Sequence, residues 1–169
     1  MKTVLLLLLA ALVISVSGHG FLFDPPARNA MWRFGYTNPV NYNDNELYCG
    51  GFSVQWQDNQ GQCGVCGDNW ADPQPRPHEA GGRYGKGIIG RRYTMGQTID
   101  IDVDISANHW GYFELKICPV DGKSRDPTQE CFDSNPLVLA DTGSEKFFVP
   151  LDSPKITKFQ YKVRGRGEG

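Results

Sequence analysis

Residues 98–105 constrain the fold most, because their side chains alternate strictly between apolar and acidic. The apolar positions are Ile99, Ile101, Val103 and Ile105, and the acidic ones between them are Asp100, Asp102 and Asp104. A period of two predicts a β-strand with one face in a core and the other in water. Side chains on a flat strand do not wrap an ion as a calcium-binding loop does, so we interpret the aspartates as a solvated face.

Several shorter runs carry weaker strand patterns. Strands are expected over residues 52–57, 146–151 and 155–163. One more strand should follow a turn at residues 106–111 and run to Ile117. Turns rich in Gly and Pro separate these runs, and helical periodicity is scarce. We therefore predict an all-β fold, an antiparallel immunoglobulin-like or fibronectin-like β-sandwich.

The region from Gly20 to Gly51 has no sustained period and is rich in Pro, Asn, Gly and aromatic residues. It is predicted to be a long ordered loop region with a short helical turn near residues 30–34. Most of its rings should pack inward as a small satellite core. A few exposed rings would form a flat surface suited to sugar rings.

Two features of the central region are interpreted as structural. The Gly-rich run at residues 81–90 lacks the Lys-Ser/Thr ending and the preceding apolar strand of a phosphate-binding loop, so we predict turns. Residues 72–77 contain three prolines and should form a rigid surface connection. His78 follows it and is interpreted as an ordinary exposed histidine, because nothing near it offers a second metal ligand.

Residues 1–18 have the layout of a secretory signal peptide. Lys2 precedes an apolar run that is too short to span a membrane, and small residues follow up to Gly18. Cleavage there would make His19 the first residue of a secreted, extracellular protein, whereas a cut one or two residues away would remove this terminal histidine. The expected domain covers residues 19–163, and the polar tail at 164–169 should be disordered.

Composition excludes several classes of partner. The chain has 17 basic and 19 acidic residues, a net charge of −2, and its basic residues are scattered, so no nucleic-acid or anionic-membrane partner is indicated. It lacks the repeats of a structural cuticle protein and any carboxylate pair whose spacing argues for a glycoside hydrolase.

Five cysteines would lie in an oxidising compartment, where disulfides are expected. Cys118 and Cys131 close a short loop and should pair. Cys49, Cys63 and Cys66 cannot all pair among themselves, so one is left over. The spacing of Cys63 and Cys66 also fits half a zinc site or a redox pair, but no second such motif accompanies it, and disulfide cysteines are favoured.

A chain that begins with His19 offers two nitrogen ligands in one residue, the α-amine and the imidazole. His109 lies on the turn between two predicted strands. If the two histidines meet, their three nitrogens form a T-shaped set with open positions, which suits copper better than zinc. Sequence spacing does not establish that they meet, and a turn histidine bonded to the backbone is the alternative for His109.

Four segments together carry a family resemblance. They are His19-Gly20 after the leader, Tyr48-Cys49-Gly50-Gly51, the Cys63-Gly64-Val65-Cys66-Gly67-Asp68 run, and Ala107-Asn108-His109-Trp110-Gly111-Tyr112. In these the chain resembles the copper-dependent lytic polysaccharide monooxygenases of the arthropod type, also described as having a chitin-binding type 4 domain. The resemblance implies a histidine brace on a flat face of the sandwich. Copper, an external reductant and O2 or H2O2 would there oxidise C1 or C4 of a crystalline β-1,4-glycan.

The resemblance also implies roles for single residues. His19 would supply the amine and one ring ligand, and His109 the second ring. Ala107 would be the small residue that crowds an axial position, and Tyr42 a surface contact with substrate. The implied partner is an insoluble polysaccharide, chitin before cellulose, and a monomer is expected.

The chain departs from the family pattern after Val163. Members of the family continue into a cysteine-containing segment and a further core strand with an axial tyrosine or phenylalanine, so the chain is expected to be a shortened form. The leftover cysteine agrees with this expectation. A chitin-binding module without turnover is therefore the alternative function.

Overall fold

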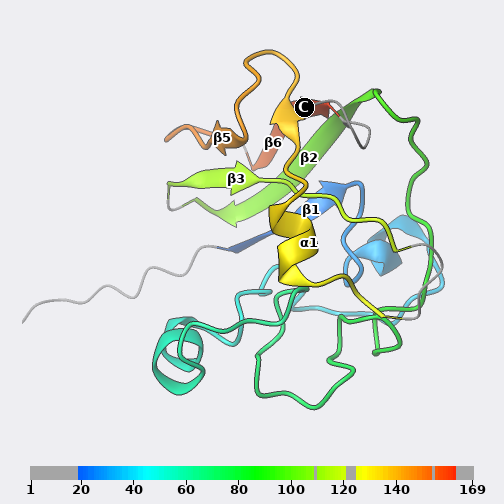
Figure 1. Ribbon diagram of the computed structural model, residues 1–169, viewed down its shortest axis with the longest axis vertical. Coiled ribbons are helices and arrows are strands. Elements are labelled where there is room, and N and C mark those ends of the chain that lie inside the picture. Colours follow the sequence, from blue (N-terminus) through cyan, green and yellow to red (C-terminus); the bar gives the residue numbers. More distant parts are fainter. Residues whose placement is uncertain (1–18, 109, 121–124, 154, 163–169) are drawn as a thin grey trace, which may run out of the picture.

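The computed structural model describes residues 19–108, 110–120, 125–153 and 155–162, which form two antiparallel sheets. The larger sheet has the strand order β1-β2-β6-β4, and β3 pairs with β5 in the smaller one (Figure 1). The strands are β1 (His19–Asp24), β2 (Thr98–Ala107), β3 (Tyr112–Glu114), β4 (Val138–Leu139), β5 (Lys146–Phe148) and β6 (Ile156–Lys162). This confirms the predicted all-β class. The expected leader and tail lie outside the described residues.

The alternation of β2 builds the core. Ile101 is fully buried and pairs with Phe159 of β6, whose ring stacks on Phe147 of β5 at 4.3 Å and on Phe113 of β3 at 5.7 Å. The two-stranded sheet therefore covers the centre of the larger one. Burial of such side chains is the main favourable term in the stability of a small sandwich.

The acidic face of β2 is only partly solvated. Asp100 accepts a hydrogen bond from Gln160, and Asp102 pairs with Lys158 at 2.6 Å. Asp104 is buried, against expectation, and its carboxylate lies 3.6 Å from the Lys155 ammonium. Asp104 has a strand on either side, since it pairs with Phe21 of β1 and with Ile156 of β6.

The first half of the chain corrects two predictions. Residues 19–24, expected to belong to the loop region, form the edge strand β1. Residues 52–57, expected to be a strand, are helical and run into a short π-helix, η2 (Val54–Asp58). Phe52 and Trp56 are exposed there, and Val54 is half-buried, so the run does not contribute a buried strand face to the core. The predicted turn near residues 30–34 is confirmed as a 3-10 helix, η1 (Met31–Phe34).

Loops, an ion pair and two disulfides hold the chain outside the sheets. Asp44 is buried and receives two hydrogen bonds from the Arg33 guanidinium, at 2.5 and 3.0 Å. The predicted disulfide Cys118–Cys131 is present, and Cys131 lies in the short helix α1 (Gln129–Asp133). The second disulfide joins Cys49 and Cys63, which leaves Cys66 as a free thiol. No helix within the described ranges is long and apolar enough to cross a membrane.

Candidate metal centre

His19 is the first residue of β1, and its Cα pairs with that of Ala107 at the end of β2. The register shifts between His19 and Gly20, and a Cβ on Gly20 would lie 2.7 Å from the Asp104 carbonyl oxygen. A side chain at position 20 would therefore force the strands apart. Glycine lets the start of β1 lie close against β2.

A loop segment at residues 43–48 holds the other side of His19. The Gly20 N–H donates to the Asn45 carbonyl oxygen at 3.2 Å, and the Asn45 amide donates to Ser106 Oγ at 3.0 Å. The segment is thus tied to β1 and β2 at the point where His19 begins the strand. The backbone position of His19 is determined from both sides.

The same segment contacts the imidazole of His19. Glu46 Oε1 lies 3.5 Å from His19 Nε2, and the Tyr48 ring stands edge-on to the imidazole, with centroids 6.2 Å apart. A carboxylate at Nε2 favours the tautomer that carries its proton there, which leaves the Nδ1 lone pair available for a metal. Neither Glu46 nor Tyr48 was predicted to contact His19. The only sequence signal was the Tyr48-Cys49-Gly50-Gly51 motif, of which Tyr48 is the first residue and which Glu46 precedes by two residues.

An open cavity of about 410 Å³ adjoins His19. Residues 19–22 of β1 and 112–115 along β3 line it, together with Ala107, Asn108 and Trp110. His109 lies outside the described residues, but both of its sequence neighbours border this cavity. The structure thus brings together His19, Ala107 and the chain on either side of His109.

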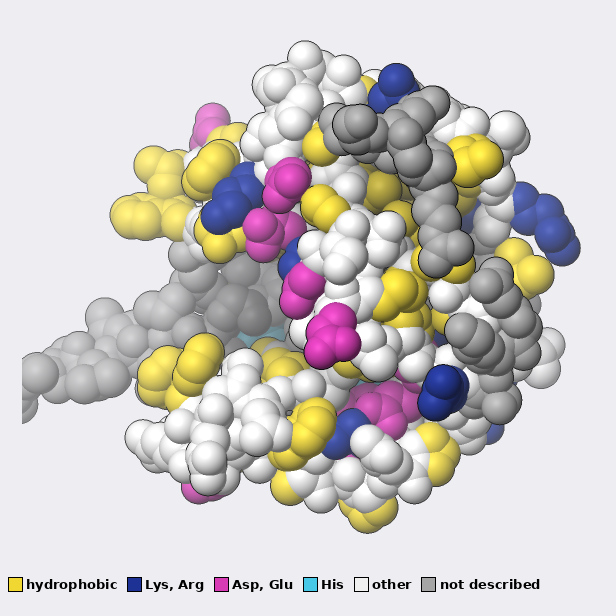
Figure 2. All heavy atoms as spheres, viewed as in Figure 1, with side chains coloured by type: hydrophobic (Ala, Val, Ile, Leu, Met, Phe, Trp, Pro, Cys, Tyr) yellow, Lys and Arg dark blue, Asp and Glu magenta, His cyan; other side chains and the backbone are white. Residues whose placement is uncertain are grey.

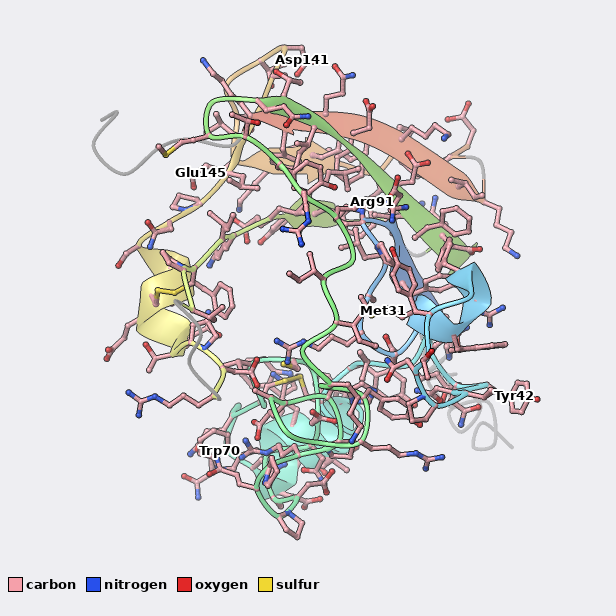
Figure 3. All side chains as sticks on the ribbon, turned by 90° about the vertical axis from the view of Figure 1, so that its right-hand side faces the viewer. Met31, Tyr42, Trp70, Arg91, Asp141 and Glu145 are labelled. Carbon is pink, nitrogen blue, oxygen red and sulfur yellow. A yellow bond between two sulfur atoms is a disulfide. The ribbon has the colours of Figure 1, made fainter. Side chains whose placement is uncertain are left out.

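Tyr42 and His78 differ in environment. Tyr42 is 82% exposed, and its ring lies edge-on to Trp32 at 5.7 Å. Figure 3 shows it projecting from the loop region. His78 is buried, which corrects the prediction of an exposed histidine: its Nδ1 lies 2.6 Å from Asp68 Oδ1, and its ring stacks on Tyr84.

The residues around His19 fit a nitrogen-donor metal site. Within the described ranges no three His, Cys, Asp or Glu side chains cluster as a metal site of their own. Glu46 is engaged at Nε2 of His19 rather than beside Nδ1. The donors available at His19 are therefore nitrogens, the preference of copper rather than of magnesium or calcium.

The fold and this geometry define a β-sandwich protein with a candidate nitrogen-donor metal site at its surface. The chain belongs to the lytic polysaccharide monooxygenases: the family model described as "Lytic polysaccharide mono-oxygenase, cellulose-degrading" matches residues 19–165. It is a copper monooxygenase of this family.

A solved structure supports the assignment. The chain is similar to the lytic polysaccharide monooxygenase AA15 from Thermobia domestica in the Cu(I) state, with 45% identity and a TM-score of 0.82. The match covers 87% of this chain and 76% of that one. The comparison with curated protein sequences gave no match. The further strand expected after Val163 stays a prediction.

Proposed function

We propose that the chain binds one copper ion through the α-amine and imidazole of His19 and the imidazole of His109, and oxidises an insoluble β-1,4-linked polysaccharide, chitin before cellulose. The observation that supports this most directly is the position of His19. It begins β1 and lines the same cavity as Asn108 and Trp110, the two sequence neighbours of His109. The copper state of the Thermobia domestica relative agrees with it.

The described residues would prepare the ligands for the metal. Copper bound there supplies one-electron chemistry toward O2 or H2O2, with electrons from an external reductant. Glu46 and Tyr48 orient the His19 ring, and the pairing of Gly20 with β2 and Asn45 fixes where the amine of a cleaved chain would lie. Ala107, whose Cα pairs with that of His19, would be the small residue that crowds the bound ion on one side.

The substrate surface would be built from exposed rings. Trp110 is 73% exposed, and Tyr42 and Tyr48 are also exposed. Figure 2 shows further hydrophobic side chains gathered over the β3–β5 layer. Rings of this kind stack on the apolar faces of sugars, and an open surface suits a crystalline polymer that cannot enter a cleft.

Secretion completes the proposal, because the brace requires a free amine on His19. Cleavage after Gly18 would supply it. The test is to express the full chain in a secreting host, load it with copper and incubate it with ascorbate on chitin and on cellulose. Oxidised oligosaccharides from the wild-type protein and none from His19→Ala are expected. Retention on chitin with no soluble oxidised product would instead favour the binding module.

A further inference from the structure

The buried carboxylate of Asp44 is anchored by two residues at η1. Arg33 of that helix donates to it twice, from Nε to Oδ2 at 2.5 Å and from Nη2 to Oδ1 at 3.0 Å. Asn29, which lies just before η1, donates to the Asp44 backbone carbonyl oxygen at 2.8 Å. A two-fold arginine–carboxylate contact fixes orientation as well as distance. The position of Asp44 therefore depends on η1.

Asp44 directly precedes the two residues that contact the metal centre. The carbonyl oxygen of Asn45 accepts a hydrogen bond from the Gly20 N–H at 3.2 Å. Glu46 Oε1 lies 3.5 Å from His19 Nε2. Because the three residues are consecutive in the chain, a displacement of Asp44 would move both contacts.

The faces of the Arg33 guanidinium contact aromatic rings that lead to the substrate surface. Its Cζ lies 4.6 Å from the ring centroid of Trp32 and 5.4 Å from that of Phe21 in β1. Trp32 in turn stands edge-on to the ring of exposed Tyr42, with centroids 5.7 Å apart. A planar guanidinium binds a carboxylate with its edge and stacks on rings with its faces, so one side chain holds both groups.

We propose that Arg33 is a positioning residue for polysaccharide oxidation, an inference that rests on the proposed function. Its ion pair holds Glu46 at the His19 imidazole, and its stacking on Trp32 holds Tyr42 at the substrate surface. One side chain thus aligns the metal centre with a substrate contact. Lysine would keep the charge here but would lack both the fork of donors and the planar face.

Amide hydrogen exchange of the copper-free secreted protein tests the first of these contacts. Exchange at the Gly20 N–H reports how firmly the 43–48 segment is held, since Asn45 accepts this hydrogen bond. Arg33→Met and Asp44→Asn should each speed exchange at Gly20 about 10-fold, because local opening becomes easier when the anchor is lost.

Copper affinity and chitin retention should separate between variants. Asp44→Asn keeps Arg33 beside Trp32, so it should weaken Cu(II) binding about 10-fold and leave retention of copper-free protein on chitin as in the wild type. Trp32→Leu should do the reverse and lower retention about 2- to 10-fold. Arg33→Met should do both. A residue that only stabilised the fold would not divide the two measurements in this way.

Arg76→Met is the matched control, because Arg76 likewise pairs with a carboxylate, that of Glu79, and lies 4.7 Å from the ring centroid of Trp70. It should change neither Gly20 exchange, copper affinity nor retention. Urea unfolding shows which variants are folded. If Arg33→Met is not, Asp44→Asn gives the result, since asparagine has the same size and still accepts a hydrogen bond.

Three results would overturn the proposal. These are unchanged Gly20 exchange in Asp44→Asn, unchanged retention in Trp32→Leu, and losses in Arg76→Met equal to those in Arg33→Met. A wild-type protein that binds no copper would instead contradict the proposed function. Exchange at Gly20 and retention are measured without copper, so the two failures are distinguishable.

Discussion

Glu46 Oε1 lies 3.5 Å from Nε2 of His19, so an acidic loop residue faces the ring nitrogen that points away from a chelating amine. Residues in this position beside a metal-binding histidine set its tautomer and its basicity. The contact joins residues 27 apart in sequence, and it exists because the 43–48 segment is bonded to both β1 and β2.

Glu46→Gln should therefore weaken copper at His19 about 10- to 100-fold, because a neutral amide orients the ring but no longer raises its basicity. Calorimetric titration with Cu(II) measures the affinity, and electron paramagnetic resonance reports the ligand field. Glu130→Gln, on the exposed helix α1, is the matched control and should change neither. An affinity equal to the wild type in Glu46→Gln would show that the carboxylate plays no positioning role.

The amino terminus decides whether a brace can form. Intact-mass analysis of the secreted protein should give a chain that begins at His19. Insertion of one glycine before His19 should abolish tight copper binding, because the α-amine then no longer belongs to the histidine. Tight binding by the extended chain would contradict the proposed ligand set.

Tyr42→Ala should weaken retention on chitin about 2- to 10-fold, since one ring contact contributes about 0.5–1.5 kcal/mol. Tyr93→Ala removes another exposed tyrosine, beside Asp24 and Arg91, and is the control. Binding isotherms on chitin beads with copper-free protein measure both. Equal loss in the two variants would mean that Tyr42 has no specific part in binding.

The core prediction concerns Ile101, which is fully buried at the centre of β2. Ile101→Ala should lower the free energy of unfolding by about 2–5 kcal/mol, the usual cost of a cavity of this size. Ile89→Ala, at a site 60% exposed, should cost under about 0.5 kcal/mol. Urea unfolding followed by tryptophan fluorescence measures both.

Burial raises the pKa of the Cys66 thiol from 9.0 to about 12. The unfolded thiol ionises first, so between these two values the unfolded chain holds fewer protons and stability falls as pH rises. The wild type should therefore lose stability relative to Cys66→Ser from pH 9 upward and show no such difference below it. Metal-free protein and urea unfolding across this range provide the measurement. A constant difference would contradict the raised pKa.

The sequence by itself determined the elements whose signal is local. The strict alternation over residues 98–105 encodes strand β2 and the face that carries Ile101, because a period of two assigns side chains to the two sides of a sheet. The pairing of Cys118 with Cys131 followed from a short loop. The motifs around His19 and Ala107 indicated the family before any contact was known.

Tertiary structure alone decided the contacts between distant segments. It made residues 19–24 an edge strand, because β2 supplies their hydrogen-bond partners. The order of apolar and polar residues in this segment does not predict a strand. Tertiary structure also turned residues 52–57 into a helical segment on which Phe52 and Trp56 are exposed. It buried His78 against Asp68 and brought Cys66 to the same pocket. Burial and proximity arise from packing across the fold, which sequence spacing does not encode.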